Sequence, residues 1–557
     1  MGSGSGTYTY KIDAMDNSAF PQGTTTKIAT GATGKIVQVS PDLPPGRTLA
    51  LASNGDVNVV AESGAPQADL YRPWVIEVMD SPIATVVNVS KGITYPYAMT
   101  GNWPQHDGQA ANRWNWVIGQ ASAGDIIEIS PGAVQAVVAD AVNYHSNNID
   151  SCGLAVLKPL TIRNMTGRGR WRVWPSGVVG LEANRNAIGV FDRLGMYDTT
   201  RGNIVLQGFD ITNQFLTSAV GVRLRSPASV EGSWARDHAS VTLRNFKIGR
   251  TSGASLSGVS GGGAEVLTLE DGHIFDCGNG SGQEHNAYVS ARTLTLRGVR
   301  MNRTRGHSST PPSSGNWDGS VTLEGHILKA SAVTGTVEGC SFDCATLGDQ
   351  SHLVQMKAGG NWTLRGNLFI DSKYPMTSRG QINMCREYAA NGVTPNFEWW
   401  AGLEGNSLTI ERNVFVGHYP RPIIGMFDWS TGALWAMYPP SHPTATAAQK
   451  LAAMTVRDNI AMIVSPPANH VLAGFPGANN AMWTNFDPTG GTTWAARGNT
   501  VMTYGTDEPG FTADEKALKR YRRSAGPVAA NAGSVAIQRF VYPHGYEPRN
   551  DAYGGLG

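Results

Sequence analysis

LTLRGVRM, residues 294–301, is one copy of a short pattern that recurs along this chain of 557 residues. An apolar, a Thr-like and a second apolar residue precede a charged residue or Gln, and a residue that is usually Gly, Asn or Asp follows. Alternation with a period of two is typical of a β-strand with one buried face. The ten copies are LTIRNMT (160–166), IVLQGFDI (204–211), VTLRNFKI (241–248), LTLEDGHIF (267–275), LTLRGVRM (294–301), GTVEGCSF (335–342), WTLRGNLFI (362–370), LTIERNVFV (408–416), MTVRDNIAM (454–462) and WAARGNTVM (494–502).

The spacing of the copies predicts a solenoid. Successive charged or Gln positions lie 26 to 46 residues apart. A short minimum interval with longer values where loops are inserted is typical of stacked coils of strands, in which neighbouring coils pair and the inward side chains form a continuous core. The sequence therefore predicts an all-β fold, with a right-handed parallel β-helix over residues 96–510.

The segments at both ends of the predicted solenoid have a different texture. DGQAANRWNWVIGQASAGDIIEISPGAV (107–134) begins as an amphipathic helix, which we expect to cap the N-terminal end of the solenoid. Residues 1–95 contain six or so strand-like runs separated by Pro and Gly turns, and they predict a small β domain for attachment or oligomerisation. Residues 511–557 are expected to form a short basic helix and a tail.

Composition excludes some classes of protein. The 44 basic and 43 acidic residues nearly cancel, which argues against a non-specific nucleic-acid binder. No apolar run approaches the length of a membrane span, and the start, MGSGSG, resembles a flexible leader rather than a secretory signal. The five cysteines match no zinc spacing and are expected to be buried, reduced thiols.

Several phrases resemble a known superfamily. GDIIEISPG (124–132) looks like the first coil of pectate-lyase-like right-handed β-helix proteins. GHILKAS (325–331), LVQMKAGGNWTLRGN (353–367) and INMCREY (382–388) resemble phrases of bacterial and phage members, of the tailspike or polysaccharide depolymerase type. The resemblance covers most of the predicted solenoid. It implies the fold but not the reaction, because the superfamily includes lyases, hydrolases, epimerases and non-catalytic spikes.

Polar residues gather in the strands that precede the repeated pattern between residues 284 and 430. Counting back twelve residues from Arg297 and Glu338 gives His285 and His326, and counting back nine gives Tyr288 and Lys329. Each pair is therefore expected to lie on neighbouring strands, about 4.8 Å apart. The candidate catalytic residues are His326, Lys329, Glu284, His285 and Glu387. The candidate substrate-binding residues are Tyr288, His352, Lys357, Arg386, Trp399 and Trp400.

These residue types fit chemistry on an acidic or hydroxyl-rich polysaccharide. Lys329, Lys357 and Arg386 could hold carboxylates, and a Lys or His of lowered pKa could remove a proton alpha to a uronate carboxyl, as β-elimination requires. Hydrolysis instead needs two carboxylates, for which Glu284, Asp349 and Glu387 are the available acids. The sequence does not choose between the two reactions.

Structural interpretations compete with each of these assignments. His285 and His326 could form a structural stack, and Lys329 could be a solvated surface residue. Trp399 and Trp400 could stack on a sugar ring or anchor their loop. The charges of the repeated pattern, such as Arg297, Arg365 and Arg457, are expected to form a solvated face.

Two classes of function follow from the sequence. The favoured hypothesis is a carbohydrate-active protein resembling a phage tailspike, a homotrimer attached to the phage tail through its N-terminal domain, which binds and depolymerises a bacterial surface polysaccharide as a lyase or glycoside hydrolase. The alternatives are a non-catalytic receptor-binding or structural virion fibre, and a secreted bacterial polysaccharide lyase. No cofactor is predicted; lyases of this fold often use calcium, but the sequence contains no calcium-site pattern.

Overall fold

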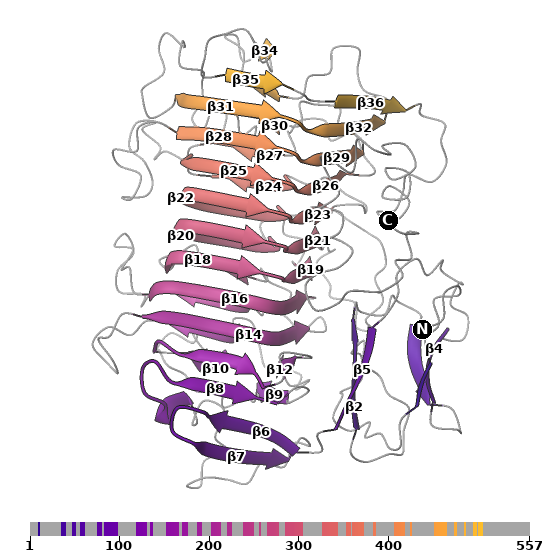
Figure 1. The fold of residues 1–557 in the computed structure, drawn as a ribbon, viewed down its shortest axis with the longest axis vertical. Helices are drawn as coiled ribbons and strands as arrows, with labels where there is room; N and C mark the ends of the chain where they lie inside the picture. The colour runs from indigo at the N-terminus through magenta and orange to yellow at the C-terminus, as the bar shows by residue number, and fades with distance from the viewer. Residues whose placement is uncertain are drawn as a thin grey trace, which may run out of the picture.

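The computed structural model describes the chain in segments. They are residues 9–11, 35–40, 47–51, 56–61, 75–80, 83–98, 118–130, 134–137, 152–156, 158–165, 170–175, 186–191, 202–212, 220–225, 238–249, 256–257, 264–277, 285–304, 326–343, 352–357, 359–371, 382–385, 406–417, 424–425, 450–464, 473–475, 484–485, 494–497 and 500–504. These segments are nearly all β-strand, and β6 to β36 belong to one sheet of 31 strands in which most neighbours are parallel (Figure 1).

The strands of the repeated pattern form one parallel stack, which we name the template ladder. Its rungs run up the long axis of Figure 1 in sequence order. They are β8 (Ile126–Ile129), β11 (Thr161–Asn164), β14 (Asn203–Thr212), β16 (His238–Gly249), β18 (Ala264–Glu270), β20 (Ala287–Arg297), β22 (Leu328–Glu338), β25 (Asn361–Arg365), β28 (Asn406–Glu411), β31 (Leu451–Arg457) and β35 (Trp494–Arg497).

Two further parallel stacks precede and follow the template ladder along the chain. The lead ladder contains β10 (Cys152–Val156), β13 (Asn186–Phe191), β15 (Val220–Arg225), β17 (Leu256–Ser257), the first parts of β20 and β22, β24 (Val354–Met356), β27 (Ile382–Met384), β30 (Ile424–Gly425) and β33 (Ala473–Phe475). The trailing ladder contains β9 (Val134–Val137), β12 (Trp171–Pro175), the last parts of β14 and β16, β19 (His273–Cys277), β21 (Arg300–Thr304), β23 (Ser341–Asp343), β26 (Leu368–Asp371), β29 (Val414–Gly417), β32 (Ile460–Val464) and β36 (Thr500–Tyr504).

The remaining strands pair in antiparallel fashion. β6 (Ile83–Asn88) pairs with β7 (Ile93–Ala98) and β8, and β34 (Thr484–Asn485) pairs with β33. Two small sheets lie outside the large one: β1 (Thr9–Lys11), β4 (Asp56–Ala61) and β3 (Arg47–Leu51) form the first, and β2 (Lys35–Ser40) and β5 (Val75–Asp80) form the second. The described part of residues 1–95 contains strands that pair in antiparallel fashion, and β6 and β7 belong to the large sheet.

The core of the large sheet follows from the two-residue alternation. In β20, Leu294 and Leu296 are fully buried, whereas Thr295 between them is partly exposed. Inward side chains of neighbouring rungs stack, as Phe342, Phe369 and Phe415 do with ring centroids 5.2 and 5.1 Å apart. Burial of such large apolar side chains is the main stabilising contribution to a fold of this kind.

The sizes of side chains on neighbouring rungs complement each other in this core. Gly335 pairs with Trp362 on the neighbouring strand, and a Cβ atom at residue 335 would lie 2.1 Å from the Trp362 ring. The glycine thus provides room for the largest side chain of the core. Any larger residue at position 335 would have to displace that ring.

A corner with positive φ occurs in eight of the template strands, from β14 to β31. The residue after the charged position has φ between 48° and 73°, and the set is Gly208, Asn245, Asp271, Gly298, Gly339, Gly366, Arg412 and Asp458. Gly, Asn and Asp tolerate this left-handed conformation best, so the predicted corner residues are confirmed and Arg412 is the exception. Sequence pattern and backbone geometry agree at this point.

An asparagine stack follows the corners after β25, β28 and β31. Asn367 Nδ2 donates to Asn413 Oδ1 at 2.9 Å, and Asn413 Nδ2 donates to Asn459 Oδ1 at 3.1 Å. The same amides bind backbone groups of the neighbouring rungs, and Cys340 N–H donates to Asn367 Oδ1 at 2.8 Å. These buried side chains satisfy backbone groups that the turn removes from the ladder. Cys340 and Cys385 are buried thiols outside any disulfide, as predicted.

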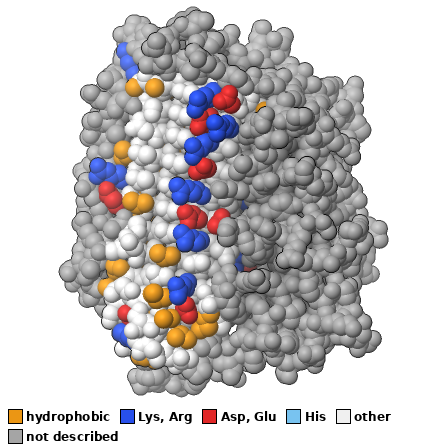
Figure 2. Space-filling view, viewed as in Figure 1, with side chains coloured by type: hydrophobic (Ala, Val, Ile, Leu, Met, Phe, Trp, Pro, Cys, Tyr) orange, Lys and Arg blue, Asp and Glu red, His pale blue; other side chains and the backbone are white. Residues whose placement is uncertain are grey.

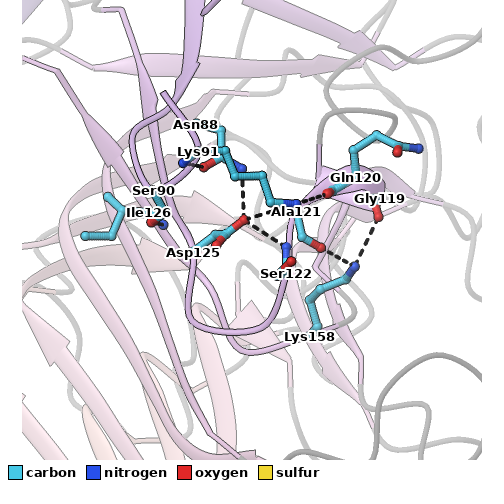
Figure 3. A network of polar contacts seen from close by, with 10 residues as sticks. All are labelled: Asn88, Ser90, Lys91, Gly119, Gln120, Ala121, Ser122, Asp125, Ile126 and Lys158. Carbon is cyan, nitrogen blue, oxygen red and sulfur yellow. Dashed lines mark hydrogen bonds and ion pairs between the residues drawn. The ribbon is translucent and has the colours of Figure 1, made fainter. Parts of the chain in front are cut away.

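Two lysine side chains bind the backbone of a helical turn at the N-terminal end of the large sheet (Figure 3). Residues 118–120 are helical, and the remainder of the predicted capping helix lies outside the described residues. Lys158 Nζ donates to the carbonyl oxygens of Gly119 and Ala121 at 3.1 and 2.6 Å, and Lys91 Nζ donates to that of Gln120 at 2.7 Å. Ammonium groups at these carbonyls stabilise a helix C-terminus.

Asp125 connects this helical turn to β6 (Figure 3). Its Oδ2 accepts hydrogen bonds from Asn88 Nδ2 at 2.9 Å and from Ser122 N–H at 2.8 Å. Burial raises the pKa of this carboxyl, but those hydrogen bonds and the charge of Lys91 outweigh burial, so the pKa lies below its usual value. The charged carboxylate is therefore part of the junction.

The predicted short basic helix and tail, residues 511–557, lie outside the described residues. Among the helical residues that the structure describes, none belongs to a helix of sufficient length and apolarity for a membrane span.

Candidate functional site

Three histidines stack along the start of the lead ladder. The rings of His285 and His326 have centroids 4.7 Å apart, and those of His326 and His352 are 5.0 Å apart. His326 N–H donates to His285 Nδ1 at 2.8 Å, and Ile327 N–H donates to the carbonyl of His352 at 3.1 Å. The predicted neighbourhood of His285 and His326 is confirmed. Their side chains are only 3% and 6% exposed, and His352 is fully buried.

Tyr288, Lys329 and Lys357 form a second cluster beside the histidines. Tyr288 pairs with Lys329 on the neighbouring strand, which confirms the predicted register. Lys329 Nζ lies 4.9 Å from the centroid of the Tyr288 ring. Lys357 comes from the next rung, and its Nζ donates to Tyr288 Oη at 2.7 Å and lies 5.4 Å from the same centroid. Two ammonium groups therefore lie close to one phenol.

The chain bends shortly after Lys357. Gly359 and Gly360 both have positive φ, 67° and 95°. A Cβ atom at residue 360 would lie 2.2 Å from the carbonyl oxygen of Ala332, so only glycine fits there. This bend ends the lead strand at Lys357, whose side chain is 7% exposed. A positive charge with so little contact with water interacts strongly with its neighbours.

The two clusters meet at His285. Its ring lies edge-on to the Tyr288 ring, with centroids 5.2 Å apart. Burial lowers the pKa of His285 well below its usual value, and the positive charges of Lys329 and Lys357 lower it further. His285 is therefore neutral near pH 7. Since Nδ1 accepts the hydrogen bond from His326 N–H, the ring proton is on Nε2.

Buried polar side chains continue along the lead ladder on the rungs that follow Lys329. Lys329 pairs with Gln355, and Gln355 pairs with Asn383, and both amide side chains are fully buried. Ser290 and Ser331, two residues beyond Tyr288 and Lys329, are 2% and 1% exposed. We use the name lead strip for the set His285, Tyr288, Ser290, His326, Lys329, Ser331, His352, Gln355, Lys357 and Asn383.

The other predicted site residues cannot be placed beside the lead strip. Glu284, Arg386, Glu387, Trp399 and Trp400 lie outside the described residues. The structure therefore brings together six of the predicted residues: His285, Tyr288, His326, Lys329, His352 and Lys357. In the described segments, no three His, Cys, Asp or Glu side chains are grouped so as to hold a metal ion.

The charges of the template ladder form a different kind of surface. Figure 2 shows them as a column of blue and red along the long axis. Their signs alternate from rung to rung, in the order Arg244, Glu270, Arg297, Glu338, Arg365, Glu411 and Arg457. We name this set the charge column. The solvated face was predicted from the sequence; the alternation of sign was not, although the residue signs and the repeat spacing together contain it.

Ion pairs connect the members of the charge column. Glu338 contacts Arg365 at 2.8 Å and Arg297 at 3.7 Å, and Glu270 contacts Arg244 at 2.6 Å and Arg297 at 3.7 Å. The Arg297 and Arg365 side chains are 54% and 45% exposed, as predicted. A row of outward threonines, including Thr295, Thr336 and Thr363, lies next to the column. Exposed ion pairs of this kind contribute little to stability individually.

Comparison with known proteins returns nothing: no family model, curated protein or solved structure matches this chain. Chemical arguments about the site therefore depend on its own geometry. The lead strip combines an aromatic ring, two ammonium groups and a neutral imidazole on three adjacent strands. Such a cluster can bind an anion and can stabilise negative charge that develops during a reaction.

Proposed function

We propose that the protein is a tailspike-like carbohydrate-active protein that binds an acidic bacterial surface polysaccharide and depolymerises it. The observation that carries the proposal is the contact of Lys357 with Tyr288, with Lys329 beside the same ring. Ammonium groups bind carboxylates, and an aromatic ring presents a flat face to a pyranose. Tyr288 and Lys329 are partly exposed, so a ligand can contact both.

The wider architecture is part of the same proposal. The three parallel ladders are the faces of one right-handed solenoid, with the helix that ends at residue 120 at its N-terminal end. Three chains form a homotrimer, and residues 1–95 attach it to the phage tail. The parallel registers, with intervals of 26 to 46 residues between paired charges, support the solenoid. A secreted bacterial lyase with the same site is the alternative setting.

A binding experiment with matched charge changes tests the proposal. The full chain is titrated with polygalacturonate, alginate, hyaluronan and capsular polysaccharides from a panel of bacteria. We expect the double variant Lys329→Ala, Lys357→Ala to bind at least about tenfold more weakly than the wild type, because a lost charge-assisted hydrogen bond from Lys329 costs on the order of 1.5–3 kcal/mol and the loss of Lys357 removes a second positive charge from the site. The control Arg297→Ala, Arg365→Ala removes the same charge from the charge column.

The two double variants give a clear decision. Unchanged binding by the control variant together with loss in the lysine variant supports the proposal. Equal losses in both variants would indicate a non-specific charge effect, and a wild type that neither binds nor cleaves any of these polysaccharides would contradict the proposal.

A second candidate function is a non-catalytic receptor-binding or structural fibre. The burial of the histidine stack and of Gln355 favours it, because closed polar strips of this kind contribute to stability and rigidity. Retained binding with neither unsaturated products at 235 nm nor new reducing ends would favour the fibre over the enzyme.

A further inference from the structure

Tyr288 lies close to the ammonium groups of two lysines. Its Oη accepts a hydrogen bond from Lys357 Nζ at 2.7 Å, and Lys329 Nζ lies 4.9 Å from the ring centroid. Lys357 comes from the second rung after Tyr288, 69 residues further along the chain, and its side chain is 7% exposed. Positive charges and donated hydrogen bonds favour the negative phenolate over the neutral phenol.

We infer that Tyr288 is the base of a β-elimination, which removes the proton alpha to the carboxyl group of a uronate residue. The inference rests on the proposed function and assigns its reaction type and its principal catalytic residue. Lys357 is then a positioning residue that keeps Oη charged. Lys329, which is partly exposed, binds the substrate carboxylate and stabilises the negative charge that moves onto it when the proton leaves.

The reaction balances with the groups at hand. The Tyr288 phenolate takes the proton from C5 of the uronate, and the electron pair of that C–H bond moves into the carboxyl group as an enolate. The pair then forms the C4–C5 double bond, and the C4–O glycosidic bond breaks. The departing oxygen takes the proton from Tyr288, which restores the phenolate. The products are an unsaturated uronate end and a free hydroxyl end, and neither an oxidant nor water is consumed.

The neighbouring histidines are less suited to the role of base. His285 is 3% exposed, its Nδ1 is occupied by the hydrogen bond from His326 N–H, and its pKa lies well below the usual value. A group that binds protons so weakly is a poor proton acceptor near pH 7. His326 and His352 are stacked behind it, 6% and 0% exposed. The three rings form one stack, and His285 at its end lies edge-on to the Tyr288 ring.

The test uses the full chain with the polysaccharide panel of the binding experiment. Product is followed at 235 nm, where unsaturated uronates absorb, and by new reducing ends. We expect the wild type to produce both signals and Tyr288→Phe to lose at least about a hundredfold in rate, as removal of a general base does. Binding by Tyr288→Phe should stay within about threefold of wild type because the ring remains. Arg365→Ala serves as the control and should keep the full rate.

A pH profile separates a chemical role of Lys357 from a structural one. In Lys357→Met, the rising limb of kcat/KM should move to higher pH, because the phenolate has lost a positive neighbour. New reducing ends without absorbance at 235 nm, or full activity in Tyr288→Phe, would overturn the inference while the proposed polysaccharide depolymerase stands. Absence of binding and of both signals in the wild type would overturn both.

Discussion

The charge column and the lead strip are built on the same strands and differ in how they distribute charge. In the column, every Arg from Arg244 to Arg457 has a Glu on an adjacent rung, and the arginine side chains are about half exposed. In the strip, Lys329 and Lys357 surround one tyrosine and Lys357 is nearly buried.

Regular strand pairing stabilises the sheet in the charge column, whereas in the lead strip it brings like charges close together. Alternating signs on neighbouring rungs attract, so the column stabilises the register at little cost. Like charges on neighbouring rungs, withdrawn from water, are unfavourable for the fold alone. Such an arrangement is typical of functional sites, where perturbed ionisation is useful.

The largest expected effect tests whether the lead strip is also structural. His326→Ala should lower the free energy of unfolding by about 2–4 kcal/mol, because it removes a buried ring from between two others. Equilibrium urea unfolding measures the change, and His326→Phe, which keeps a ring, should lose much less. A loss below about 1 kcal/mol in His326→Ala would mean that the stack contributes little.

The pH dependence of stability should differ between the two regions. Because the pKa of His285 is depressed in the folded protein, the unfolded chain binds a proton more readily below about pH 6.5. Stability from this group is therefore complete above that pH and declines as the pH falls, by at most about 1.4 kcal/mol per pH unit. His285→Asn should remove this decline, which urea unfolding at pH 7.5, 6.5 and 5.5 would measure. Parallel curves for the variant and the wild type would contradict the expectation.

A smaller effect is expected at the corner that follows Glu411 of the charge column. Arg412 has φ 55°, a left-handed conformation that costs an ordinary residue on the order of 1–2 kcal/mol. Arg412→Gly should raise the free energy of unfolding by about 0.5–1 kcal/mol after the entropy of glycine is subtracted. Gly366→Ala, at φ 62° with open space around its Cβ position, is the matched opposite and should destabilise by about 1 kcal/mol. Changes of the same sign in both variants would show that the corner does not control stability.

The smallest effect should come from the charge column itself. Glu338→Gln removes the ion pairs to Arg365 and Arg297, and we expect a loss of no more than about 1 kcal/mol. The loss should shrink between 0.05 M and 1 M NaCl, because salt screens exposed charges. A loss that is independent of salt would place Glu338 among the buried interactions instead.

The sequence predicted most accurately which residues lie side by side at equivalent positions of neighbouring repeats. The pairing of Tyr288 with Lys329 and the contact of His285 with His326 follow from counting back equal distances from Arg297 and Glu338. The corner residues followed from their preference for positive φ.

Other features of the site depend on backbone bends and burial, which the sequence pattern does not contain. The Lys357–Tyr288 contact spans two rungs, and the bend at Gly359 and Gly360 accompanies one additional residue between β24 and β25. A count in fixed steps does not reveal this bend. Burial of Gln355 on the outward parity of β24 was equally invisible, because alternation alone predicts exposure there.

The unequal spacing of the paired charges has a consequence for how such a chain can change. Arg244 and Glu270 are 26 residues apart and Arg365 and Glu411 are 46 apart, yet both pairs are in the same register on adjacent strands. Closing the longer stretch costs only about 0.5 kcal/mol more in chain entropy. Foreign peptides of some twenty residues could therefore be grafted between the strands at little thermodynamic expense, which makes the ladder a frame for exchangeable recognition elements.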